Sequence, residues 1–136
     1  MKDGQYTYML KLSSNPCNIA VIESFVDKLA QQYALQPDTY GNILISLTEA
    51  VNNAIIHGNR NDESKAVHVH LKKQKNSLAI VVSDEGPGFD YDNLPDPTSP
   101  ENLLKVGGRG VFLMHRLSNR IRFFNNGSTV EMHFNI

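Results

Sequence analysis

ISLTEAVNNAIIHGN, residues 45–59, predicts an amphipathic helix with an acid and an amide on the same side. Side chains four residues apart point the same way on an α-helix, so Glu49 and Asn53 can act together on one object. Asn42 and Ser46 share this side of the helix. The other side carries a wide apolar stripe, made of Ile43, Leu44, Leu47, Val51, Ala54 and Ile55. This stripe predicts which side of the helix faces the core.

Two interpretations of the Glu49–Asn53 side stay open on this helix alone. It can be an ordinary solvated surface, or it can line a cleft. Ile45 and Ile56 project within a fraction of a turn of the pair, which puts large apolar groups on this side and predicts that it is covered. A carboxylate beside apolar cover favours the cleft.

The size and charge of the chain limit the classes of function. A length of 136 residues predicts one domain, residues 1–136, with a substantial hydrophobic core. The net charge is −1, and the lysines and arginines are scattered along the sequence. We therefore expect no direct binding to DNA, since the chain has no basic patch to hold a phosphate backbone.

The cysteine content and the apolar runs indicate a compartment. Cys17 is the only cysteine, which excludes an intramolecular disulfide and fits a reducing environment. No charged leader with an apolar core opens the sequence, and no apolar run approaches the roughly 20 residues that span a bilayer. We therefore expect a cytoplasmic protein that does not bind membranes.

The spacing of apolar residues along the chain predicts a two-layer fold. Alternating apolar residues predict strands, whereas apolar residues three and four apart predict helices. The expected order is a strand at 5–12, helices at 13–34 and 37–57, strands at 67–71 and 78–82, a helix at 110–118, and a closing hairpin of 121–124 and 129–136. The strand at 78–82 is continuously apolar, so we expect it to be central. The fold class is α+β, a two-layer α/β sandwich whose mixed, mostly antiparallel sheet has helices on one face.

DEGPGFD, residues 84–90, follows this central strand directly. Asp84 therefore stands at a strand end, and Gly86 and Gly88 would let the backbone approach a flat ligand closely. The pattern D-x-G is also common in surface turns, so the motif alone supports either interpretation.

A long segment, residues 85–109, leads from this motif to the next predicted helix. It is rich in glycine and proline, and a loop of this length inside a compact domain is typical of a lid over a ligand. The segment runs into GGRG, residues 107–110, where the free N–H groups of a helix start can bind an anion. Lys105 and Arg109 could add positive charge there. The alternative is a flexible hinge that ends in a helix start.

The motifs occur in a fixed order: the acid–amide helix, a strand with DEGPG, the long segment, GGRG with its helix, and Gly127-Ser128-Thr129 on a late strand. Together they resemble the GHKL-type ATP-binding domain shared by gyrase-type ATPases, heat-shock chaperones of the ninety-kilodalton class, histidine kinases and MutL. The whole chain takes part in this resemblance. EAVNNAIIHGN and GRGVFLMHRL are similar to the corresponding motifs of the anti-sigma-factor serine kinases, whose substrate is a small antagonist protein.

Carried over by position, the resemblance implies a role for each polar motif residue. Asn53 would bind the Mg2+ that bridges the phosphates of ATP, and Glu49 would act as general base toward the incoming hydroxyl. Asp84 would accept a hydrogen bond from the adenine amino group, and Thr129 would support that contact. Phosphoryl transfer needs mainly positioning, a metal and neutralisation of charge, which this set of groups could supply.

The resemblance also implies roles for the glycines. Gly86 and Gly88 would let the backbone lie close to the base. Gly108 and Gly110 would present N–H groups to the phosphates as the lid closes, with Arg109 as a weaker candidate for the same anion.

The resulting hypothesis is a homodimeric protein-serine kinase that phosphorylates a STAS-type anti-sigma antagonist and sequesters a sigma factor of RNA polymerase. One alternative is a non-catalytic module that uses bound nucleotide to shape a surface for a partner. Glu49 argues against it, since a pure binder needs no base there. Another is a detached histidine-kinase-like ATPase domain, which the absence of a dimerisation helix with a phosphoacceptor histidine disfavours.

Overall fold

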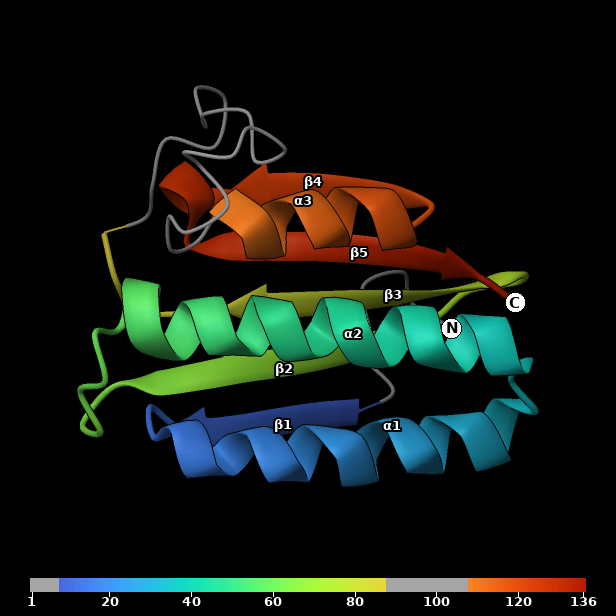
Figure 1. Ribbon diagram of the computed structural model, residues 1–136, viewed down its shortest axis with the longest axis horizontal. Coiled ribbons are helices and arrows are strands. Elements are labelled where there is room, and N and C mark those ends of the chain that lie inside the picture. The colour runs from blue at the N-terminus through green and yellow to red at the C-terminus, as the bar shows by residue number, and fades with distance from the viewer. Residues whose placement is uncertain (1–7, 88–107) are drawn as a thin grey trace.

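A computed structural model describes residues 8–87 and 108–136, in which five strands form one sheet (Figure 1). The strands are β1 (Tyr8–Ser13), β2 (Ala66–Lys73), β3 (Ser77–Ser83), β4 (Arg120–Phe124) and β5 (Thr129–Asn135). Their order across the sheet is β1-β2-β3-β5-β4, and all four pairings are antiparallel. The predicted α+β sandwich is confirmed, and the pairings observed are purely antiparallel.

Three helices lie on one face of this sheet, as Figure 1 shows. They are α1 (Ile19–Tyr33), α2 (Pro37–Asn53) and α3 (Gly108–Leu117). None of the helices within the described ranges is long and apolar enough to cross a membrane. α2 packs against both α1 and α3, so it is the middle helix of the layer. The helix carrying Glu49 and Asn53 is therefore held from both sides.

The hydrophobic core lies between the helices and the sheet. Alternate side chains of a strand point to opposite faces, and those of β3 that face the helices, Leu78, Ile80 and Val82, are buried. Ala79 and Val81 on the second face are buried as well, which confirms the prediction of a central strand. The end of β3 is thereby fixed at the middle of the sheet.

The first helix, expected from residue 13, begins with a capped turn a few residues later. Asn15 caps a 3-10 turn (Pro16–Asn18), where its side chain accepts a hydrogen bond of 2.9 Å from the backbone N–H of Cys17. Pro16 occupies the first position, where its missing N–H costs little. α1 continues from there and ends at Ala34 in the left-handed conformation.

α2 ends differently from the prediction. The α-helical part stops at Asn53, and a π-helical turn (Ala54–Gly58) continues it. The backbone N–H of Asn59 bonds the carbonyl of Ala54 at 2.8 Å, a spacing of five residues that widens the last turn. Contacts of Gly58 and Asn59 with the end of β3, described below, stabilise this wider turn.

The side of α2 that carries Glu49 is covered, although not in the predicted way. Ile45 is 45% exposed, so the expectation that it lies under cover was wrong. Ser46, expected on the polar side, is fully buried, and its hydroxyl has no hydrogen-bond partner among the described residues. Ile56 packs against the core, as expected. α3 packs against α2, so the covered face is rotated from Ile45 toward Ser46.

The last strands form the predicted hairpin. Its turn (Asn125–Gly127) has positive φ at all three residues, with values of 53°, 59° and 91°. Asparagine and glycine adopt this conformation more readily than other residues, which explains the sequence of the turn. The turn brings the start of β5 beside the end of β3.

Candidate functional site

The side chains of Glu49 and Asn53 meet at the first turn of α3. A Cβ atom added to Gly110 would lie 2.8 Å from Glu49 Oε2 and 2.9 Å from Asn53 Nδ2. Both side-chain ends therefore reach the same point on the α3 backbone, which confirms the prediction that they point the same way. Any side chain at position 110 would fill the space in front of them.

Asp84 lies against the π-helical turn that continues α2. A Cβ added to Gly58 would lie 2.3 Å from Asp84 Cγ, so the carboxylate rests directly on the glycine backbone. Gly86 approaches the same turn, because its added Cβ would lie 1.9 Å from the carbonyl oxygen of Gly58. Gly86 and Gly58 thus pack backbone against backbone, which only glycine permits, and the Asp84 side chain packs on the same Gly58.

Three consecutive backbone N–H groups hold the turn after β3. The N–H of Asp84 donates to the carbonyl of Ser128 at 2.9 Å, and that of Glu85 donates to Asn59 Oδ1 at 2.7 Å. The N–H of Gly86 donates to Asp84 Oδ1 at 2.8 Å. Within the described residues, Asp84 Oδ2 accepts no hydrogen bond, so one carboxylate oxygen is available to a donor on a ligand.

Burial raises the pKa of Asp84 above its ordinary value of 3.8, and the hydrogen bond from Gly86 opposes this effect. No lysine or arginine whose side chain is described, in residues 8–87 and 110–136, forms an ion pair with this carboxylate. Asp84 is therefore a half-buried carboxylate at the end of the central strand, and its burial disfavours the charged form.

Thr129 lies beside the end of β3 on the second face of the sheet. It pairs with Ser83 in the register, and its hydroxyl donates to Ser83 Oγ at 3.2 Å. The Asp84 side chain instead packs on Gly58 in the helix layer. The structure therefore brings Thr129 next to the strand end that carries Asp84, whereas the described contacts do not include one between the two side chains.

The glycines that the sequence predicts to bind phosphate fall partly within the described chain. Gly108, Arg109 and Gly110 form the start of α3, which confirms a helix start at GGRG. The predictions on Gly88 and Lys105, like those on the lid, lie outside the described residues, as does the side chain of Arg109.

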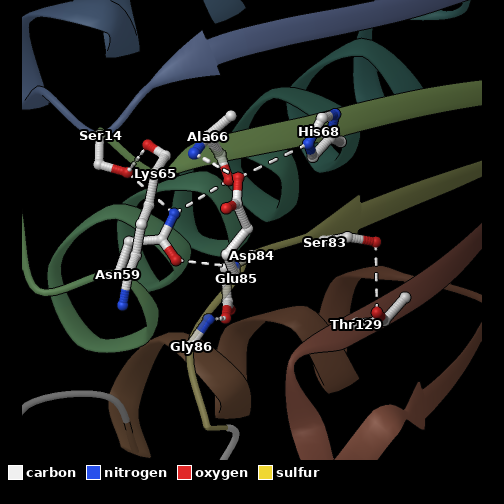
Figure 2. Close-up of polar contacts among 10 residues, drawn as sticks. All are labelled: Ser14, Asn59, Lys65, Ala66, His68, Ser83, Asp84, Glu85, Gly86 and Thr129. Atoms are coloured by element: carbon white, nitrogen blue, oxygen red, sulfur yellow. Dashed lines mark hydrogen bonds and ion pairs between the residues drawn. The ribbon is translucent and has the colours of Figure 1, made fainter. Parts of the chain in front are cut away.

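Sequence reasoning missed the polar network that holds this end of the sheet, which Figure 2 shows. Asn59, at its centre, is only 1% exposed. Its neighbour Ser14, which is also buried, donates to the carbonyl of Lys65 at 2.7 Å. In the sequence, Asn59 begins a polar run after a glycine and resembles an ordinary exposed turn residue.

Comparison with known families agrees with the order of these elements. A family described as the histidine kinase-like ATPase domain matches residues 12–134, which is nearly the whole chain. The chain belongs to this family. Membership in a family of ATPase domains implies binding of ATP.

Individual relatives cover most of this histidine kinase-like ATPase domain. Serine-protein kinase RsbW of Bacillus subtilis is 27% identical over 139 aligned residues, covering 97% of this chain and 87% of that protein. The protein of the same name from Bacillus licheniformis is 28% identical, with 90% of this chain and 81% of the relative covered. That from Staphylococcus aureus strain JH9 is 30% identical over 65% of this chain and 60% of its own length.

Proposed function

We propose that this chain is a protein-serine kinase that transfers a phosphoryl group from ATP to a serine of a STAS-type anti-sigma antagonist. The observation that carries the proposal is the meeting of Glu49 and Asn53 at Gly110. A carboxylate and a hard oxygen ligand are thereby placed at the start of a helix, where backbone N–H groups favour anions. The relatives named serine-protein kinase support the same activity.

Glu49 and Asn53 have different roles at the phosphate end, one as general base and the other as metal ligand. The carboxamide oxygen of Asn53 would hold Mg2+, which when bound neutralises charge on the phosphates. The absence of a side chain at Gly110 fits this assignment, since an added Cβ would displace the ends of both groups. Glu49 accepts the proton of the substrate serine hydroxyl. At the same time the serine oxygen forms a bond to the terminal phosphorus of ATP, and the bond from this phosphorus to the oxygen of the leaving ADP breaks.

The helix start carries the phosphates themselves. Gly108 and Gly110 present backbone N–H groups from the first turn of α3, and these groups have no acceptor within the helix. Arg109 is a weaker candidate for the same anion.

Asp84 binds the other end of the nucleotide. Its carboxylate accepts a hydrogen bond from the adenine amino group, which offsets the cost of burying the charge. Gly86 lets the backbone lie close to the base, and we assign the same role to Gly88. Thr129 supports the contact from the neighbouring strand, through the hydrogen bond it makes to Ser83.

The regulatory part of the proposal extends the sequence resemblance. We propose a cytoplasmic homodimer, one domain per chain, that sequesters a sigma factor when it does not act on the antagonist. The exposed first strand, with Met9 70% exposed and Tyr8 37% exposed, is compatible with contact to another chain. No part of the proposal requires contact with DNA or a membrane.

The test uses purified protein with Mg-ATP and a STAS-domain antagonist encoded nearby. We expect phosphoserine on the antagonist, and at least a hundredfold slower transfer in Glu49→Gln, with ATP binding retained. Glu23→Gln is the matched control, because Glu23 lies exposed on α1 and loses the same charge. ATP binding without transfer in the wild type would indicate the non-catalytic module. Full activity in Glu49→Gln would contradict the assignment of the base.

A further inference from the structure

Asn59 is a buried amide that uses its hydrogen-bonding groups on three different segments. Its Nδ2 donates to Ser14 Oγ at 2.9 Å and to the carbonyl of Ala66 at 3.0 Å. Its Oδ1 accepts from the backbone N–H of Glu85 at 2.7 Å. Figure 2 shows the carboxamide between the start of β2 and the turn that follows β3.

The register of the sheet shows that the Asn59 side chain takes the place of a backbone pairing between β2 and the residues after β3. His68 pairs with Ser83 at the end of the β2–β3 ladder, so continuing the register by two residues would pair Ala66 with Glu85. That pairing does not form. The carbonyl of Ala66 and the N–H of Glu85 both bond the Asn59 side chain, which stands between the two backbones.

The side chain of Glu85 completes a closed ring of hydrogen bonds. Its Oε2 accepts from the backbone N–H of Ala66 at 2.7 Å. The N–H of Ala66 thus bonds the side chain of Glu85, and its carbonyl bonds the side chain of Asn59. Because the two strands are held apart here, the chain at Asp84 turns away from β2 toward the helix layer. There the Asp84 carboxylate rests on Gly58, the residue directly before Asn59.

We propose that Asn59 is a positioning residue for adenine recognition. It keeps β2 and β3 apart beyond His68 and Ser83, and so fixes the Asp84 carboxylate on Gly58. This inference rests on the proposed function, in which Asp84 binds the adenine amino group. The role needs a carboxamide, since one end must donate twice and the other must accept, and neither leucine nor a carboxylate can do both.

The experiment compares the affinities for ATP and ITP, because the base of ITP has a carbonyl group where adenine has the amino group. In wild type we expect ATP to bind at least about tenfold more tightly, equivalent to about 1.4 kcal/mol. In Asn59→Ala, Glu85 can pair directly with Ala66, so Asp84 moves and the preference falls to near one. An unchanged ratio in folded Asn59→Ala would overturn the inference.

Ser14→Ala is the matched control, since it removes an acceptor of Asn59 without touching the bond to Glu85. It should keep the ATP preference. A preference lost equally in Ser14→Ala would show that general loosening is responsible and would overturn the positioning role.

A second measurement on the wild type does not depend on the variant folding. The side-chain amide resonances of Asn59 should shift on addition of ATP and much less on addition of ITP, and equal shifts would contradict the inference. A wild type that binds neither nucleotide, or both alike, would instead contradict the proposed adenine site. The two failures are therefore distinguishable.

Discussion

Among single residues, Asp84 shows most directly how function and stability oppose each other. Burial raises the pKa of its carboxyl group, so the charged form is disfavoured in the fold. In the unfolded chain the group ionises near 3.8, and in the folded chain it ionises at higher pH. As pH rises between these two values only the unfolded chain loses its proton, so stability falls. Above the folded pKa the cost is constant.

Asp84→Asn should therefore remove both the free-energy cost of the buried charge and the proposed contact with ATP. At pH 7 the variant should be at least as stable as wild type in chemical denaturation, since its side-chain oxygen can still accept from Gly86. The difference should shrink as pH falls through the folded pKa toward 3.8. Calorimetry should show ATP binding weakened by tenfold or more. A variant that is much less stable at pH 7 would assign Asp84 a structural role.

The residues that sequence reasoning missed share a physical cause. Glu49 and Asn53 could be paired from the sequence because their geometry is set within one helix. Asn59 and Glu85 are 26 residues apart, and they meet only because the sheet register brings Ala66 opposite Glu85. Local patterns carry no information on such a meeting, so a buried amide resembled an exposed turn residue.

Among the elements, α2 and α3 together form the proposed phosphate end of the site. α2 supplies Glu49 and Asn53, and α3 supplies a backbone start with no side chain at Gly110. The period of apolar residues predicted both helices. The same pattern wrongly predicted that Ile45 is covered. Which side of α2 is covered depends on where α3 packs, and the sequence of α2 alone does not determine that position.

Gly110→Ala should separate fold from catalysis. The added methyl group meets only the flexible ends of Glu49 and Asn53, so the fold can adapt, and we expect a stability change within about 1 kcal/mol. The two side chains must move, however, and a displacement of about 1 Å can cost about a hundredfold in rate. The kinase assay should show that loss.

Gly41→Ala is the control within α2. No atom lies within 4 Å of its added Cβ, so the variant should gain roughly 0.5–1 kcal/mol from helix propensity and keep its activity. Wild-type transfer by Gly110→Ala would contradict the placement of the phosphate end.

For the molecule as a whole, each end of the proposed site combines residues from before and after residues 88–107. Glu49, Asn53, Gly58 and Asp84 precede this segment, whereas Gly110 follows it. The N–H of Asp84 also bonds Ser128, from the later part of the chain. A ligand that contacts both ends therefore joins the two parts of the fold.

Mg-ATP should raise the melting temperature accordingly. At about one hundred times its dissociation constant, a ligand of the native state adds about 2.7 kcal/mol. For a chain of 136 residues this corresponds to roughly 10 °C in a thermal scan. Asp84→Asn, at the same ATP concentration, should show a rise of about half that size or less, because tenfold weaker binding leaves about 1.4 kcal/mol of stabilisation. An equal rise in both proteins would place the nucleotide elsewhere.

The strand order also predicts the order in which the parts of the sheet form during folding. β2 with β3 and β4 with β5 are hairpins with short turns, whereas Ser83 and Thr129, which join the two hairpins, are 46 residues apart. Closing that long loop costs more conformational entropy, so the hairpins should form first and dock afterwards. The bond from Asp84 to Ser128 forms only at docking. Nucleotide should therefore slow the unfolding of this protein and leave its folding rate nearly unchanged.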